Sequence, residues 1–119
     1  MKPLTKDQHR QLLENGRINA ERQQADQEPI DFRPVVKLFT PDAGATWLLT
    51  ELDPEDNDIA FGLCDLGLGY PELGTVRLSE IAELRGRLGL PVERDRFFTA
   101  DKPLSAYAEE AHRLGSVNV

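Results

Sequence analysis

The sequence has few of the residues that build covalent or metal-linked frameworks. Its 119 residues contain one cysteine, Cys64, and two histidines, His9 and His112. A single cysteine cannot form an internal disulfide, and two histidines near opposite ends of the chain give no zinc constellation. We therefore expect no disulfide and no zinc site, and a reducing cytoplasm is the expected location. No residue pattern in the sequence leads us to expect a cofactor, another metal or a catalytic residue.

The chain also lacks a long apolar run. No stretch approaches the roughly 18 apolar residues that a membrane span needs, and the N-terminus MKPLTKDQHRQLLENG has no apolar centre of the secretory kind. The formal net charge of −7 disfavours nonspecific binding to nucleic-acid phosphate or to anionic lipid, because both kinds of binding depend on concentrated Lys and Arg. We expect no membrane association, and the charge disfavours a nucleic-acid partner without excluding a local basic patch.

What the chain does contain is typical of a globular protein. Hydrophobic residues make up 39% and charged residues 29% of the sequence. A chain of this length buries one core of its own but not two, so residues 1–119 are predicted to form a single domain. Its oligomeric state is left open by the sequence.

Residues 1–30 are predicted to form a helical segment. Thr5 and Gln8 stand at the spacing of a capping box, which favours a helix start at Thr5. The pair at residues 15–16, Asn-Gly, is typical of a helix end. The following residues, 17–28, have one strong apolar anchor, Ile18, and predict either a short, poorly anchored helix or a connector.

Residues 34–78 are predicted to form a β meander. Strands are expected at 35–40, 46–52, 59–66 and 75–78, because these runs are rich in branched, aromatic and alternating apolar residues. Turns rich in Pro, Gly, Asp and Asn separate them.

Residues 79–115 are predicted to form a helix, a loop and a second helix. Ser79 is a suitable cap for the first helix and Gly89 a suitable end, while 92–99 is either a short strand or an ordered loop. Apolar residues at helical spacing predict the last helix, with Gly115 as its end. The expected fold class is α+β: a mainly antiparallel meander of three or four strands with N-terminal and C-terminal helices packed on it.

Several short motifs occur in a fixed order along the meander and beyond it. They are VVKLFTP, TWLLTELD, FGLCDLG, ELGTV, LSEI, RGRLGLP and ERDRFF. Together they resemble a family of small bacterial proteins known only as a domain of unknown function. The resemblance covers nearly everything from Pro34 to Phe98, and the LTK opening and the NGR element also fit. It implies no reaction, cofactor or catalytic residue, but it suggests a setting on plasmids and other mobile elements.

Charge is segregated within the meander. No Lys or Arg lies between Lys37 and Arg77, whereas eight acids do. They are Asp42, Glu51, Asp53, Glu55, Asp56, Asp58, Asp65 and Glu72. They form either a surface that attracts a basic partner protein or imitates the phosphate spacing of nucleic acid, or acidic turns that keep hairpin edges soluble. The turn at 53–58 lacks the glycine and distant glutamate of a calcium loop, so we interpret it as an ordinary acidic turn.

A mixed sheet face is the second candidate site. Strand alternation predicts that aromatic and charged side chains share one face, which is the usual composition of a binding hot spot. The predicted contact residues are Lys37, Phe39, Trp47, Glu51, Asp53 and Arg77. The alternative is that helices flank both faces and bury the rings.

We therefore expect a small, acidic, non-enzymatic accessory protein that acts by contact with a protein partner. The rival hypothesis is a metal-assisted hydrolase that uses Glu51, Asp53 and a further carboxylate. Nucleic-acid binding ranks third, and it would require Arg85, Arg87, Arg94 and Arg96 to cluster on one face.

Overall fold

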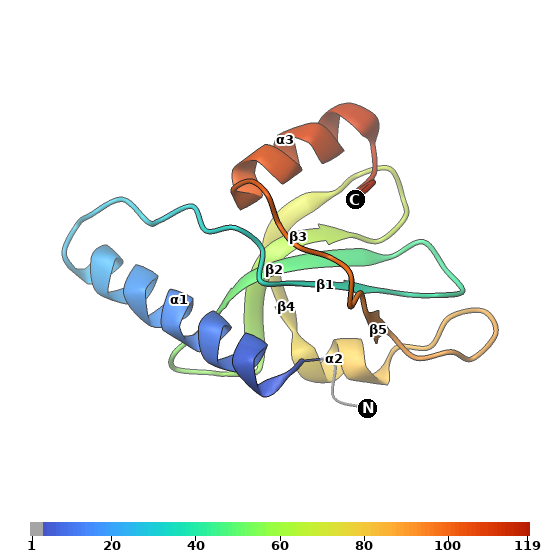
Figure 1. The fold of residues 1–119 in the computed structure, drawn as a ribbon, viewed down its shortest axis with the longest axis horizontal. Coiled ribbons are helices and arrows are strands. Elements are labelled where there is room, and N and C mark those ends of the chain that lie inside the picture. The colour runs from blue at the N-terminus through green and yellow to red at the C-terminus, as the bar shows by residue number, and fades with distance from the viewer. Residues whose placement is uncertain (1–3) are drawn as a thin grey trace.

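A five-stranded antiparallel sheet with a helix on each side organises the computed structural model, which describes residues 4–119 (Figure 1). Its elements are α1 (Lys6–Gln24), β1 (Val36–Phe39), β2 (Thr46–Leu52), β3 (Ile59–Asp65), β4 (Glu72–Arg77), α2 (Leu78–Glu83), β5 (Glu93–Arg94) and α3 (Leu104–Leu114). The strand order is β4-β3-β2-β1-β5. The predicted α+β class is confirmed. Within residues 4–119, no helix is long and apolar enough to cross a membrane.

The sheet has one strand more than predicted. β5 consists of two residues, in which Arg94 pairs with Leu38 and Glu93 pairs with Phe39 of β1. This pairing decides between the strand and the loop that the sequence left open for 92–99. Two residues are too few to show the alternation that identifies a strand in a sequence.

Helix α1 is longer than predicted. It begins as expected, because the Thr5 side chain accepts from the Gln8 N–H and the Gln8 side chain accepts from the Thr5 N–H. The prediction that it ends at 15–16 is wrong, since it continues to Gln24. A β-carbon on Gly16 would lie 1.7 Å from the carbonyl oxygen of Leu52, so this glycine serves a close helix–strand approach rather than a helix end. Residues 1–3 of the predicted helical segment lie outside the described residues.

Helix α2 is shorter than predicted. It ends at Glu83 instead of near Gly89, and the chain then forms a loop in which the Gly86 N–H donates to the Leu90 carbonyl. Asp42, from the turn between β1 and β2, holds this loop by accepting from the Leu88 N–H at 2.7 Å. The last helix ends at Gly115 in the left-handed conformation, as predicted.

The two faces of the sheet carry separate hydrophobic clusters. The cluster on the α1 face contains Leu12, Val36, Leu38, Trp47, Leu49, Leu52, Ala60, Ile81 and Val92. The cluster on the α3 face contains Leu48, Leu63, Leu104, Tyr107, Ala108 and Ala111. Figure 1 shows α1 and α3 well apart, with the sheet between them. The helices at the two ends of the chain therefore cover opposite faces.

Replacing Gly16 with alanine tests the close approach of α1 to β2. On an exposed helix position this change adds about 1 kcal/mol of stability. At Gly16 we expect a loss of about 2–3 kcal/mol, because the methyl group would force the helix off the backbone of Leu52. Urea unfolding measures the difference.

Gly74 provides the matched control, since a β-carbon there meets nothing within 4 Å. Gly74→Ala is expected to change the free energy of unfolding by less than about 1 kcal/mol. Equal effects of the two substitutions would contradict the close approach.

Candidate functional site

Two asparagines of α1 attach the helix to β2 through hydrogen bonds. The Asn15 side-chain amide donates to the Thr50 carbonyl at 2.9 Å. The Asn19 amide donates to Oε2 of Glu51 at 2.9 Å and to the Ile30 carbonyl at 3.1 Å, and its oxygen accepts from the Ile30 N–H. Because both asparagines are buried, these bonds fix the position of Glu51 and of the chain that follows α1.

A bulge in β2 determines which face Glu51 occupies. Leu49 pairs with Gly62, but Glu51 pairs with Phe61, so Thr50 is an extra residue in β2. Leu49 belongs to the cluster on the α1 face, whereas Phe61 packs on the cluster on the α3 face. Glu51 therefore lies on the α3 face, in a row with Phe61 of β3 and Thr75 of β4.

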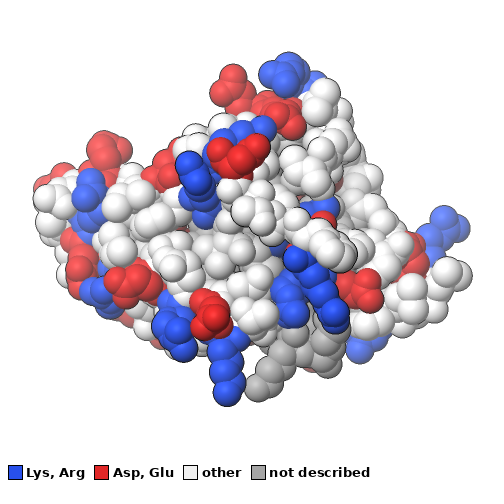
Figure 2. All heavy atoms as spheres, in the orientation of Figure 1, with Lys and Arg blue, Asp and Glu red and all other residues white. Residues whose placement is uncertain are grey.

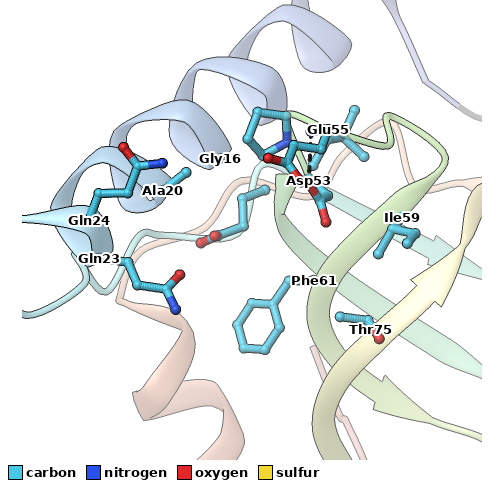
Figure 3. Close-up of a pocket in the computed structure, with 12 residues that line it drawn as sticks. Gly16, Ala20, Gln23, Gln24, Asp53, Glu55, Ile59, Phe61 and Thr75 are labelled. Carbon is cyan, nitrogen blue, oxygen red and sulfur yellow. Dashed lines mark hydrogen bonds between the residues drawn. The ribbon is translucent and has the colours of Figure 1, made fainter.

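The structure is hollowed around this row. Two adjoining hollows of about 410 Å³ and 690 Å³ share Gln23, Glu51 and Phe61, and we call them together the Glu51 cleft. The first is lined by Gly16, Ala20, Gln23, Gln24, Glu51, Leu52, Asp53, Pro54, Glu55, Ile59, Phe61 and Thr75. The second is lined by Asn19, Gln23, residues 26–31, Glu51, Phe61, Leu73, Leu104 and Ser105. Figure 3 shows Gln23, Phe61 and Thr75 around the first hollow, with Asp53 and Glu55 at its rim.

The lining of the Glu51 cleft is acidic. Its charged residues are Asp26, Glu28, Asp31, Glu51, Asp53 and Glu55. Among the described residues, no Lys or Arg lines it. Burial raises the pKa of Glu51, and the hydrogen bond from Asn19 opposes this shift without cancelling it. Glu51 is thus a half-buried carboxylate whose hydrogen-bond partner is a neutral amide.

The structure does not bring the six predicted contact residues together on one face. Trp47 is 2% exposed and lies in the α1-face cluster, because it pairs with Leu38 rather than with Phe39. A one-residue difference in register moves a side chain to the other face of a sheet. The assumption that Trp47 shares a face with Lys37 is therefore wrong, while a role of the remaining residues in binding stays a prediction.

The other five residues occupy three places. Glu51 and Asp53 line the same cleft. The Lys37 ammonium lies 3.2 Å from Asp95 Oδ2, 5.7 Å from the centre of the Phe39 ring, and also donates to the Val119 carbonyl. Arg77 forms ion pairs with two acids of the turn after β2, at 3.2 Å and 3.6 Å.

Every aspartate of the acidic block between Lys37 and Arg77 accepts a hydrogen bond from a backbone N–H. The acceptors are Asp42, Asp53, Asp56, Asp58 and Asp65. These bonds close turns or hold neighbouring loops, as short acidic side chains commonly do. The three glutamates of the block, Glu51, Glu55 and Glu72, make no such bond to the described backbone.

The acidic block does not form one surface. The acids at 53–58 follow β2, whereas Asp42 precedes it and Asp65 and Glu72 flank the turn between β3 and β4. Because the strands are antiparallel, these groups lie at opposite ends of a seven-residue strand, about 20 Å apart. The acids are therefore divided between two groups at the ends of β2, and a role as a nucleic-acid mimic stays a prediction.

Metal-assisted hydrolysis lacks a ligand set in the part of the chain that the structure describes. No group of three or more His, Cys, Asp or Glu side chains there is arranged to hold a metal ion. Glu51, Asp53 and Glu55 line one hollow, but within residues 4–119 they are not arranged to hold a metal ion together.

One of the four arginines named for nucleic-acid binding, Arg85, has a local structural role. Arg85 donates to the carbonyls of Ala82 and Leu84 at the end of α2. Figure 2 shows basic and acidic side chains interspersed over one face of the molecule, without a broad basic area. On α1, for example, Arg17 lies 2.5 Å from Glu14 and 3.0 Å from Glu21.

Sequence reasoning missed Asn15 and Asn19. Their signal is the four-residue spacing of two amides on the helix face that also carries Leu12. Amides in line with an apolar stripe indicate a helix that docks on backbone or polar groups rather than on apolar side chains. The Asn-Gly pair was instead interpreted as a helix end.

Comparison with known proteins identifies a family but no function. The family model described as "Protein of unknown function (DUF2958)" matches residues 3–118, so the chain belongs to this family. This confirms the resemblance to a domain of unknown function. No curated protein and no solved structure matches the chain.

The raised pKa of Glu51 predicts how stability depends on pH. A carboxyl whose pKa is higher in the folded state opposes folding once it is ionised, so its contribution worsens as the pH rises through that pKa. Glu51→Gln stays neutral and still accepts from Asn19. We expect a higher melting temperature than wild type at pH 7, and a smaller difference near pH 4.3, the ordinary glutamate pKa.

Glu109→Gln is the control, because Glu109 is exposed on α3. Its melting temperature is expected to follow wild type at both pH values. A Glu51→Gln protein that is less stable than wild type at pH 7 would show that the carboxylate stabilises the fold.

Proposed function

We propose that this DUF2958 protein is a non-enzymatic accessory protein that binds a basic segment of a partner protein in the Glu51 cleft. The observation that carries the proposal is the half-buried Glu51 carboxylate, which has a neutral partner and no Lys or Arg in the surrounding lining. A ligand that brings its own cation would supply the missing charge.

The energetic reason is the cost of a desolvated carboxylate. Burial of a charge is unfavourable unless an opposite charge or several hydrogen bonds compensate it. Binding of a Lys or Arg side chain beside Glu51 would compensate that cost, and the pKa of Glu51 would fall toward its ordinary value. The acids at the rim, such as Asp53 and Glu55, add attraction at longer range.

The composition of the lining also fits a Lys or Arg side chain. Ile59 and Phe61 offer apolar surface for the methylene groups, and the Phe61 ring is a potential cation–π partner. The two hollows, 410 Å³ and 690 Å³, have the size of sites that hold a few side chains. A peptide segment therefore suits the cleft better than a flat protein surface does.

The cellular setting in this proposal is a bacterial plasmid or other mobile element, in the cytoplasm. Its support is the resemblance of the motifs along Pro34 to Phe98 to proteins common on such elements. In this setting the protein would act on the machinery of the cell by contact.

Affinity capture with two charge-matched variants tests the proposal. The cleft variant is Glu51→Gln with Glu55→Gln, and the control variant is Glu83→Gln with Glu109→Gln, on exposed positions of α2 and α3. Each removes two negative charges by the same chemical change. We expect the wild type and the control variant to retain a protein from a lysate of the source cell that the cleft variant loses.

A second measurement identifies the chemistry of the bound segment. Peptides that tile the captured protein are tested for binding to the wild type by isothermal titration calorimetry. The proposal predicts that the binding peptide contains Lys or Arg, and that replacing these residues with Ala abolishes the binding. Loss of the captured protein from both variants equally, or binding of a peptide without basic residues, would contradict it.

A further inference from the structure

β4 is an open edge of the sheet. It is the last strand in the order β4-β3-β2-β1-β5, and its six pairs with β3 contain no bulge. Natural edge strands are commonly blunted by Pro, Lys, a bulge or short length, but Glu72–Arg77 contains no Pro and no Lys. The opposite edge, β5, is only two residues long. β4 is thus the edge that can accept another strand.

The backbone groups that point outward from β4 follow from one hydrogen bond. The Leu78 N–H donates to the Asp58 carbonyl at 2.8 Å, so the adjacent pair, Ile59 and Arg77, is not hydrogen-bonded to each other. Since bonded and non-bonded pairs alternate, the N–H and C=O groups of Leu73 and Thr75 also point away from β3. Within residues 4–119, these outward groups have no backbone partner.

The open edge is also the rim of the Glu51 cleft. Thr75 lines the first hollow and Leu73 lines the second. Thr75 pairs with Phe61, which in turn pairs with Glu51 on β2. A strand added beside β4 would therefore lie about 5 Å from Thr75, about 10 Å from Phe61 and about 15 Å from Glu51. Every second side chain of that strand would stand beside this row, on the same face of the sheet.

We propose that an extended, Lys- or Arg-bearing segment of the partner protein adds to the sheet as a sixth strand along β4. The inference rests on the proposed function, because it gives the backbone conformation of the basic segment that the cleft would bind. Main-chain hydrogen bonds to Leu73 and Thr75 supply affinity, and basic side chains directed into the cleft supply specificity.

Charge selects a basic segment over a second copy of this chain. Glu72 is exposed on the edge strand, and the single base of β4, Arg77, is paired with Asp56 and Asp58. The cleft beside the edge has an acidic lining without Lys or Arg. Two copies, each with a formal net charge of −7, would repel one another along this edge.

The chain just before β4 adds apolar anchors. Leu68 is 73% exposed and Tyr70 is 80% exposed in the loop between β3 and β4, and Leu73 on the strand is 44% exposed. Exposed apolar and aromatic side chains in one stretch are typical of contact surfaces for proteins. Leu68 and Tyr70 therefore extend the proposed contact surface beyond the hydrogen-bonding edge of β4.

Substitutions at Thr75 separate the backbone from the side chain. Thr75→Pro removes the outward N–H but leaves the bonds to β3, because proline is tolerated where an edge N–H faces solvent. Thr75→Ala removes the side chain and keeps the N–H. Circular dichroism and melting temperature establish that each variant is folded before binding is measured.

The probe is an octapeptide of alternating Lys and Thr, with two analogues. One analogue carries Glu in place of Lys, and the other is N-methylated at alternate residues so that it cannot pair along its binding edge. For the wild type we expect saturable shifts of the Leu73 and Thr75 amide resonances below about 1 mM peptide, with hydrogen exchange at these amides slowed about tenfold. Thr75→Ala is expected to bind similarly, and Thr75→Pro at least about tenfold more weakly.

Each other outcome overturns the inference in a distinct way. Equal binding of the N-methylated peptide, or equal binding to Thr75→Pro, shows that the peptide does not pair with β4. Equal binding of the Glu peptide would contradict a basic sixth strand. So would the absence of any shift of these amide resonances up to about 1 mM peptide. A dimer of the protein that Thr75→Pro abolishes assigns the edge to a second copy. If Thr75→Pro fails to fold, the N-methylated peptide gives the same decision.

Failure of this inference differs from failure of the proposed function. The captured partner is tested with the same Thr75→Pro variant. Retention by Thr75→Pro and loss by Glu51→Gln with Glu55→Gln leaves the cleft as the binding site without strand addition. Retention by both variants contradicts the proposed function itself.

Discussion

The close approach of α1 to β2 is the constraint on which the rest of the structure depends. Gly16 allows the helix backbone to touch the Leu52 carbonyl, and no other residue has room there. The same approach brings Asn15 to the bulged Thr50 and Asn19 to Glu51. A bulge leaves backbone groups without a ladder partner, and the Asn15 amide satisfies one of them. The helix, the bulge and the orientation of Glu51 therefore form one unit.

Features that local chemistry determines were predicted from the sequence. The capping box at Thr5, the glycine end of α3 and the main strands depend on neighbouring residues, and the structure contains them. The continuation of α1 beyond Gly16 was not predicted, because it depends on a strand 36 residues away, whereas the Asn-Gly pair alone favours a helix end. The same holds for β5, whose pairing with β1 shows no pattern within its two residues.

The candidate site was predicted in part, for a reason that lies in strand register. Glu51 and Asp53 were named from the sequence and line one cleft. Trp47 was assigned to the wrong face because alternation describes each strand by itself and does not fix the pairing between strands. The bulge at Thr50 adds one residue to β2, so Glu51 lies on the opposite face of the sheet from Leu49. Asparagines of α1 complete the site, and helix-forming propensity gives no hint of them.

The aspartates of the meander show that a chain's acidity can serve its architecture. Asp42 and Asp65 each accept backbone N–H groups from loops distant in the sequence, 46 and 52 residues away. Such carboxylates take the place that carbonyl oxygens would hold in a longer sheet or turn. The low isoelectric point is then partly a by-product of loop anchoring. Substitution of these aspartates to raise the isoelectric point would therefore loosen the loops before it altered any binding surface.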